Sequence, residues 1–412
     1  MALILIAWPV TVLGAQGFNI TPMGQLIFTV DHSDPVPGGG SLTEARVVQP
    51  VLMLDGSAFG GKLAFVATAD FEGLTIPHGE LTPGAWGEGF VDRRHPHTYA
   101  HELTVAGNDL LGRLDGSGRL GVVVGKGFVP FGTDDPMSRP FVRYPVNHHL
   151  AQILERAIGV VQYGLGPVTI EAALFNGDEP TRPGDWPVIR TPQGTWRFGD
   201  SRAARVTVRP VQHFEVQGSL ARVSSPENRD GGGPEVYKAS TSARWDDHPS
   251  WGERYVLIEW ERSDELGNFL VLHSLLAEAM VRRGRFALSY RFERTDRPEE
   301  PRLVDPFRTV YPNPDNDIAG ITRWTLHTLH LSADLFPHGT HLGLQPYIEV
   351  TRGSVASVAG GVFDPFTEYG TDDVNALNVG LKVDWGMAGH RMGRYGVLDE
   401  PMMMMPPGAM RM

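Results

Sequence analysis

Apolar and polar residues alternate at every second position through most of the chain after residue 20. The clearest example is the segment Arg285–Glu293, whose apolar positions are Phe286, Leu288, Tyr290 and Phe292. A period of two places the apolar set on one face of a β-strand and the polar set on the other. Segments 342–350 and 377–385 repeat the pattern, whereas helical periodicity is confined to about residues 149–157. The chain is therefore predicted to be all-β.

The alternating segments predict sixteen strands, and the connections between them differ in length in a regular way. Short connections alternate with long ones at 72–96, 133–156, 177–202, 297–320 and 353–373. Transmembrane barrels show this rhythm, because their periplasmic turns are short and their extracellular loops are long. We therefore expect a transmembrane antiparallel β-barrel of about 16 strands over residues 17–386. The strands should begin near residues 24, 45, 61, 98, 118, 157, 167, 203, 214, 235, 252, 268, 284, 321, 341 and 375.

The two ends of the chain differ from the rest in composition. Residues 2–15 are apolar but too short to span a bilayer, which is typical of a secretory signal peptide over residues 1–16. A basic stretch before it is missing, so its start is expected to be truncated; the alternative is a buried N-terminal strand. Residues 387–412 are rich in methionine, proline and glycine and are expected to form a flexible periplasmic tail. Its thioethers suit Cu(I).

Composition excludes several classes of function. The net charge of -12 argues against a nucleic-acid partner, which would need a basic face. The absence of cysteine excludes disulfides, thiolate zinc sites and iron–sulfur clusters. No phosphate-binding loop, dinucleotide fingerprint or nucleophile elbow occurs in the sequence, so neither an enzyme nor a cofactor is expected.

The polar faces of the predicted strands carry charges of both signs. In a soluble sandwich the polar face meets water outside, whereas in a porin it lines the interior. With the barrel interpretation, the pore wall is predicted to contain Lys62, Arg205, Arg209, Arg285, Arg291, Arg323 and Lys382, together with Asp70, Glu171, Glu215, Glu259, Glu261, Glu293, Glu349 and Asp384. These charges nearly cancel, so the wall alone should discriminate weakly between small ions.

The long connection at 133–156 is the candidate pore constriction. It contains Asp134, Asp135, Arg139 and Arg143, and the two arginines are the candidates for contact with an anion. Folded into the barrel, these charges would set the field at a narrow point of the pore. The alternative is an extracellular lid with solvated charges.

The segment Val124–Gly132, VGKGFVPFG, leads into this connection. It resembles the strand and third-loop entry of phosphate-selective-type outer-membrane porins. The resemblance implies a sixteen-stranded diffusion channel with one loop folded into the pore, and it implies a homotrimer. The chain departs from the family because its predicted wall is not a basic ladder and because residues continue past Trp385. The substrate of the family is therefore not transferred.

The densest group of imidazoles in the sequence is formed by His95, His97 and His101, next to Glu102. Imidazole and carboxylate ligands suit zinc, copper or nickel, but the spacing is not that of a helical zinc protease. If the strand begins by Thr98, His101 shares the lipid-facing positions of its neighbours and lies at the barrel rim. A rim role and a metal site both remain open.

Three functions follow from these patterns. The first is a passive outer-membrane porin, in contact with outer-membrane lipid, that admits small hydrophilic solutes or ions. The second is an outer-membrane barrel that handles copper through the methionine-rich tail and the histidine group. The third is a soluble secreted β-protein that binds polysaccharide through its aromatic side chains.

Overall fold

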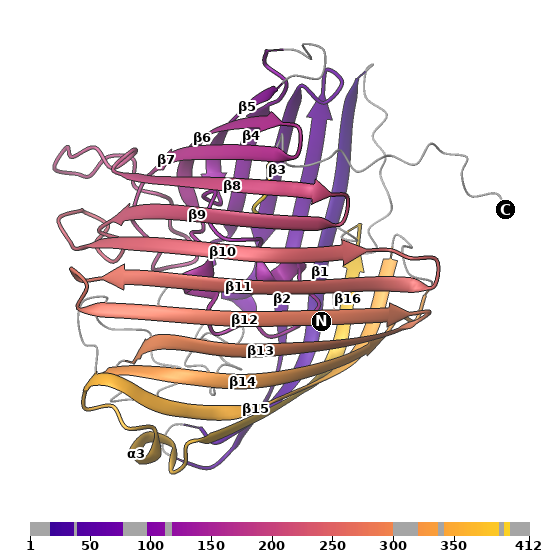
Figure 1. The fold of residues 1–412 in the computed structure, drawn as a ribbon, viewed down its shortest axis with the longest axis vertical. Coiled ribbons are helices and arrows are strands. Elements are labelled where there is room, and N and C mark those ends of the chain that lie inside the picture. The colour runs from indigo at the N-terminus through magenta and orange to yellow at the C-terminus, as the bar shows by residue number, and fades with distance from the viewer. Residues whose placement is uncertain are drawn as a thin grey trace.

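The computed structural model describes residues 17–36, 39–76, 97–111, 118–299, 320–336, 342–386 and 391–395. In that part of the chain sixteen strands close into one barrel, in which each strand pairs antiparallel with its neighbours in sequence and β1 pairs with β16 (Figure 1). The predicted all-β fold and the sixteen-stranded barrel are confirmed. The strands are β1 (Phe18–Asp34), β2 (Leu42–Ala58), β3 (Leu63–Asp70), β4 (Ala100–Gly107), β5 (Arg119–Gly127), β6 (Arg156–Leu165), β7 (Val168–Phe175), β8 (Ser201–Val211), β9 (Phe214–Ser224), β10 (Glu235–Asp247), β11 (Gly252–Glu265), β12 (Leu270–Arg283), β13 (Phe286–Glu299), β14 (Gly320–Ala333), β15 (Leu342–Gly361) and β16 (Asp373–Trp385).

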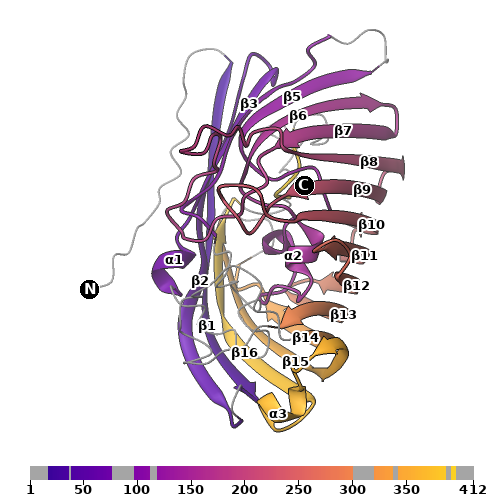
Figure 2. The same cartoon turned by 90° about the vertical axis from the view of Figure 1, so that its left-hand side faces the viewer.

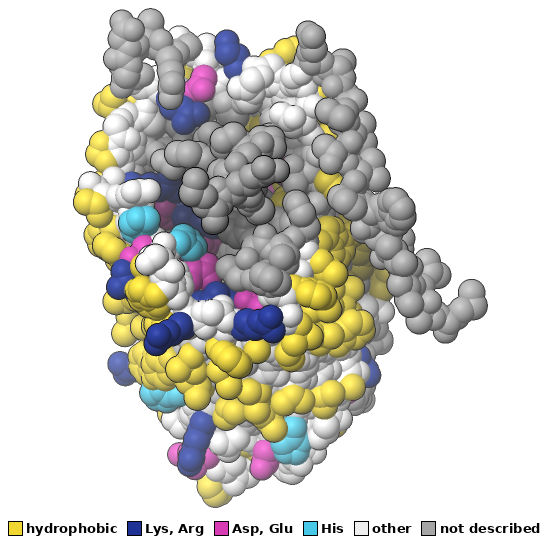
Figure 3. All heavy atoms as spheres, turned by 90° about the vertical axis from the view of Figure 1, so that its right-hand side faces the viewer, with side chains coloured by type: hydrophobic (Ala, Val, Ile, Leu, Met, Phe, Trp, Pro, Cys, Tyr) yellow, Lys and Arg dark blue, Asp and Glu magenta, His cyan; other side chains and the backbone are white. Residues whose placement is uncertain are grey.

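The barrel is apolar outside and polar inside. On β13, Leu288 is 51% exposed on the outer face, whereas Arg291 on the inner face is 1% exposed. Figure 3 shows the same division at one end of the barrel, where charged side chains gather in the hollow and hydrophobic ones surround it. A soluble β-sandwich has the opposite arrangement, because it buries its apolar faces. The soluble polysaccharide-binding interpretation therefore has no support in this fold.

Connection length separates the two ends of the barrel. Turns such as 166–167, 212–213 and 284–285 lie at the short-turn end, and the connections 176–200 and 225–234 lie at the opposite, long-loop end. The rhythm is not strict, since β11 and β12 are joined at the long-loop end by residues 266–269 alone, whereas β4 and β5 are joined at the short-turn end by the longer connection 108–118. Two short helices, α1 (Glu72–Thr75) and α3 (Pro365–Tyr369), also lie at this end. Among the described residues, the helices are all too short to cross a bilayer.

The connection 128–155 does not stay at the long-loop end. Its 3-10 helix η2 (Pro136–Ser138) and its helix α2 (His148–Ala151) belong to a segment that folds into the ring of strands, as Figure 2 shows for α2. Residues 128–155 are called the inner loop below. Its side chains and those of the barrel wall bury one another in the lumen.

Three predicted wall residues do not face the lumen. Lys62 and Arg285 are exposed turn residues, because β3 begins only at Leu63 and β13 only at Phe286. Arg323 points outward while its neighbour Trp324 is fully buried inside. The pairing of β14 with β15 shifts register next to this position, and the Trp324 indole donates to Glu299 Oε1 at 3.2 Å.

Candidate functional site inside the barrel

The inner loop is attached to several strands of the wall. At its start, the Gly132 N–H donates to Ser219 Oγ of β9 at 3.0 Å, and Thr133 Oγ1 donates to Ser242 Oγ of β10 at 2.7 Å. Further along, the Val142 N–H donates to Glu349 of β15 and the Val146 N–H donates to Glu293 of β13. The wall carboxylates Glu293 and Glu349, predicted to face inward, thus hold the backbone of the loop across the lumen. The expectation of an inward-folded loop is confirmed, and that of an external lid is wrong.

Gly132 explains why the loop turns inward at its first residues. Its φ angle of +71° lies in the left-handed region, and a Cβ atom there would lie 1.8 Å from the carbonyl oxygen of Ala151. Only glycine allows the start and the end of the inner loop to approach so closely. The Val129 N–H donates to the Ile153 carbonyl at 3.0 Å and closes the base of the loop.

Arg139 and Asp134, two of the four predicted constriction residues, form the centre of an ion-pair network. The Arg139 guanidinium donates to both oxygens of Glu259 on β11, at 2.7 and 3.0 Å, and to Asp134 Oδ1 at 3.3 Å. Asp134 also binds Arg244 of β10. Burial would raise the pKa of Asp134, but the charges of the surrounding arginines outweigh it and hold this pKa well below its usual range. Asp134 is therefore ionised, and the charge of Arg139 is compensated by protein carboxylates.

The other two predicted constriction residues are also buried. Arg143 is 8% exposed; its N–H donates to Glu349 at 3.2 Å, and its carbonyl accepts from Arg291 of β13 at 2.8 Å. Asp135 is 2% exposed, and as the N-cap of η2 its carboxylate accepts from the Met137 N–H. The structure thus brings all four residues into the lumen, where they hold the loop in place.

The predicted wall charges are mostly paired. Arg205 of β8 donates twice to Glu171 of β7, at 2.5 and 3.0 Å, and Arg291 donates to Glu278 of β12 at 2.7 Å. Arg209 donates to Glu215 of β9 at 3.0 Å. Towards the short-turn end of β16, Lys382 and Asp384 are half-buried and share the inner-face parity of Asn378.

Residues 391–395 were not expected in the lumen. The sequence predicts a flexible periplasmic tail over 387–412, but the described part of it, Arg391–Tyr395, packs inside the barrel against the inner loop. This part is called the C-terminal segment below. Its Met392, Arg394 and Tyr395 side chains are each at most 4% exposed.

The C-terminal segment is held mainly by its two arginines. Arg391 donates to both oxygens of Glu215, at 3.1 and 3.2 Å, and to Asp134 Oδ2 at 2.9 Å. Arg394 donates to Glu215 at 3.0 Å and to Thr207 Oγ1 at 3.3 Å. The segment therefore adds two positive charges to the network that holds the inner loop. Sequence reasoning missed it, although two arginines and a tyrosine within a tail of methionine, proline and glycine were a visible signal.

Backbone contacts complete the attachment of the C-terminal segment. The Asp135 N–H donates to the Met392 carbonyl at 3.3 Å, and Arg205 donates to the Gly393 carbonyl at 3.3 Å. The Tyr395 hydroxyl accepts from the Phe128 N–H at 2.7 Å. The segment thus touches both the inner loop and the wall.

The histidine group lies in the lumen, not at the rim. His95 is outside the described residues, but His97, His101 and Glu102 are all at most 7% exposed. The rim position expected for His101 is wrong, because the pairing of β3 with β4 shifts register between Thr68 and Ala69 and lets both His101 and Glu102 turn inward. The rings of His97 and His101 have their centroids 5.0 Å apart.

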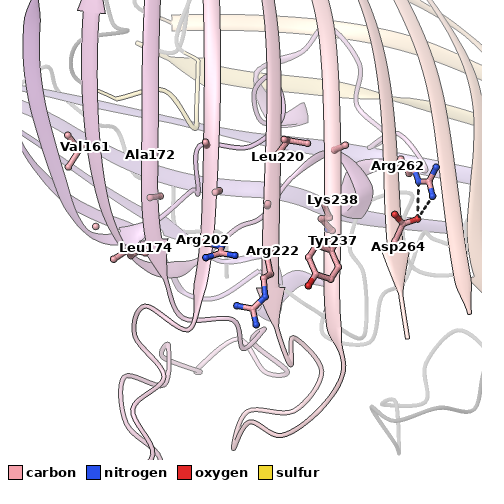
Figure 4. Close-up of a pocket in the computed structure, with 16 residues that line it drawn as sticks. Val161, Ala172, Leu174, Arg202, Leu220, Arg222, Tyr237, Lys238, Arg262 and Asp264 are labelled. Atoms are coloured by element: carbon pink, nitrogen blue, oxygen red, sulfur yellow. Dashed lines mark hydrogen bonds and ion pairs between the residues drawn. The ribbon is translucent and has the colours of Figure 1, made fainter. Parts of the chain in front are cut away.

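A groove of about 790 Å³ lies on the outer wall over β6 to β11. Its floor consists mainly of small residues such as Ala172, Ala204 and Ala239, and Figure 4 shows Arg202, Arg222 and Tyr237 near the long loops. Long basic and amphipathic side chains at the edge of an apolar surface are typical of the boundary between hydrocarbon and lipid head groups.

The closed barrel with one loop inside it can be compared with solved structures. An anion-selective porin from Comamonas acidovorans superposes with a TM-score of 0.50 at 12% identity, over 89% of this chain and all of that chain. The fold is that of a porin. OmpT of Vibrio cholerae gives a TM-score of 0.45 at 12% identity, over 90% of this chain and 99% of that one, and OmpF of Salmonella typhi gives 0.48 at 9%, over 89% and 98%. Searches with protein-family models and against curated proteins gave no match.

Proposed function

We propose that the protein is a passive outer-membrane porin that admits small hydrophilic solutes or ions. The observation that supports this most directly is the inner loop, which Glu293 and Glu349 hold across a polar lumen inside a barrel with an apolar outer face. A porin fold of this kind supplies a water-filled path, and a loop within it narrows that path. Transport needs no chemical step, so no catalytic residue is assigned.

The constriction in this proposal is formed by the inner loop and the C-terminal segment together. Asp134, Asp135, Arg139 and Arg143 position the loop, and Arg391 of the segment binds the loop at Asp134. Because carboxylates and guanidinium groups pair with one another here, little unbalanced charge is left to select ions. We therefore propose weak ion selectivity, and we do not extend the resemblance at Val124–Gly132 to phosphate selectivity.

The partners in this proposal are the solute and the lipid around the barrel. Acyl chains would pack in the groove over β6 to β11, with the guanidinium groups of Arg202 and Arg222 close to the lipid head groups. The exposed outer-face residues Leu288 and Leu329, each 51% exposed, would face the hydrocarbon core. A homotrimer, as the family resemblance implies, is part of the proposal and is tested by the mass of the detergent complex.

Reconstitution into planar bilayers tests the proposal. The full chain should add discrete ohmic conductance steps and give a reversal potential close to zero in a tenfold KCl gradient. Arg139→Gln should leave Glu259 without its partner and move the reversal potential towards cation preference. The proposal would be contradicted if the folded protein inserted into the bilayer but carried no current, both as the wild type and as a variant without residues 387–412.

A further inference from the structure

A second site lies in the lumen beside the inner loop, between β3, β4 and the residues that precede β4. One potential ligand atom from each of Asp70, His97 and His101 lies within 4.8 Å of the others. All three side chains are buried, with Asp70 1%, His97 7% and His101 0% exposed. Three potential metal ligands thus converge on one point that water reaches poorly. Neither the ion pairs of the inner loop nor the proposed channel requires this arrangement.

Two atoms of the group are left without a hydrogen bond. His101 Nε2 and Asp70 Oδ2 are buried and have no hydrogen-bond partner among the described residues. Asp70 Oδ2 lies 3.3 Å from His97 Nδ1, but that nitrogen is closer to Glu72 Oε2, at 2.9 Å. A buried polar atom without a partner costs free energy, so two such atoms within one group of potential metal ligands point to an electrophile as their partner.

His101 is oriented as metal-binding histidines are. Its Nδ1 donates to Glu155 Oε1 at 2.6 Å, which leaves the lone pair of Nε2 free to bind a metal. A carboxylate on the far nitrogen is the usual support of a metal-bound histidine, because it fixes the tautomer and the ring orientation. Glu155 is itself held by the Thr98 N–H and by Lys126.

The spacing and the ligand types indicate which metal fits. In a tetrahedral zinc site with bonds of about 2.0–2.2 Å, neighbouring ligand atoms are about 3.4 Å apart. The separation of Asp70 Oδ2 from His97 Nδ1 is 3.3 Å. Two imidazoles and one carboxylate favour first-row transition metals over the hard cations Ca²⁺ and Mg²⁺, which prefer oxygen ligands.

We infer that Asp70, His97 and His101 bind a divalent first-row transition metal such as Zn²⁺, with Glu155 as the positioning residue behind His101. The fourth position would be taken by water or by the adjacent Glu72 carboxylate. The metal would tie β3 and β4 to the residues that precede β4, and through Glu155 to the end of the inner loop. The inference is independent of the proposed channel, because it requires only the folded barrel.

Zn²⁺ titration of the full chain, folded in detergent and stripped with a chelator, tests the inference. The wild type should bind one equivalent tightly in competition with a chromophoric chelator, and Ca²⁺ should not displace it. Asp70→Asn and His101→Asn, which keep approximate side-chain size, should each weaken this equivalent by more than tenfold. Glu155→Gln should weaken it by about 10–100-fold, as is usual when the support of a metal ligand is lost.

His330→Asn is the matched control. His330 is also buried and also pairs with a carboxylate, since its Nδ1 lies 3.0 Å from Glu349 Oε2, but it belongs to no group of three potential ligands among the described residues. Its loss should leave Zn²⁺ affinity unchanged. Co²⁺ should give the visible absorption of a tetrahedral complex in the wild type and in His330→Asn, and not in His101→Asn. Equal Zn²⁺ affinity in the wild type, Asp70→Asn and His101→Asn would overturn the inference, as would a wild type that binds no Zn²⁺.

Discussion

Replacement of the two arginines of the C-terminal segment is the perturbation that most directly probes the constriction. In an Arg391→Gln, Arg394→Gln double variant, Glu215 retains Arg209, and Asp134 retains Arg139 and Arg244. Two positive charges leave the lumen while every carboxylate remains. The lumen should therefore become cation-selective.

The size of the effect follows from the distances. A monovalent cation about 4 Å from one unit of unbalanced negative charge is stabilised by about 1 kcal/mol at the dielectric constant of water. With RT near 0.6 kcal/mol, this corresponds to about a fivefold gain in the ratio of cation to anion permeability. The gain should shrink with added salt, because the Debye length falls from about 30 Å at 0.01 M to about 10 Å at 0.1 M.

The assay is the reversal potential of single channels in a KCl gradient, measured at low and high total salt. The control is Arg254→Gln, which removes an arginine paired with Asp247 on the outer side of the barrel and should leave the reversal potential unchanged. A variant without residues 387–412 should show the same shift together with a larger conductance, since the five described residues of the segment leave the lumen. A double variant with the reversal potential and conductance of the wild type would show that the segment lies outside the conducting path.

Three further changes test the wall, the loop and the ion pairs. Leu329→Arg on the outer face should lower the free energy of unfolding in lipid vesicles by about 2–4 kcal/mol, and Leu329→Ala by less, as measured by urea titration. Gly132→Ala should lower the free energy of unfolding more than Gly166→Ala does. An alanine in the left-handed conformation costs about 1–2 kcal/mol at either position, but only at Gly132 does the new Cβ meet a carbonyl oxygen. Equal losses of stability in the two variants would refute this steric explanation. The pKa of Asp134 is lower in the folded than in the unfolded chain, so its stabilisation is present above about pH 4 and lost as pH falls further. In Asp134→Asn the free energy of unfolding should therefore fall less steeply below about pH 4 than it does in the wild type. The same pH dependence in the variant and the wild type would contradict this.

The strands were predictable because the alternation of apolar and polar residues is a local feature of each strand's own sequence. On β13 the alternation from Phe286 to Glu293 is complete, and a slip by one residue would reverse every side chain, so the faces follow from the pattern. The prediction failed where a strand departs from a simple apolar-outward pattern. The register shift beside β4 turns His101 inward. On β14, Arg323 has the parity of the exposed Leu329, whereas the apolar Trp324 and Leu326 face inward, so apolar character alone gives the wrong face for this part of the strand.

The contents of the lumen were only partly predictable. Arg139 and Glu259 are far apart in the sequence, and no local pattern indicates that a loop arginine will meet a carboxylate of a particular strand. The C-terminal segment was harder still, since its composition is typical of a disordered tail and its position depends on Glu215 and Asp134 in the folded barrel. Sequence patterning thus describes the wall, whereas the contacts that fill the barrel are set by charge complementarity between distant segments.

The same complementarity limits how the lumen can change. Each arginine named in this network faces a carboxylate from another element: Arg139 binds Glu259 of the wall, and Arg391 binds Glu215 of the wall and Asp134 of the inner loop. Removal of one partner leaves a buried charge uncompensated, which costs far more than the loss of an exposed ion pair. The inner loop and the C-terminal segment therefore support one another through Asp134, and a substitution in either should alter the position of both. We therefore expect ion selectivity in this barrel to be altered mainly by substitution of paired residues on different segments, and less by substitution of a single charged residue on the wall.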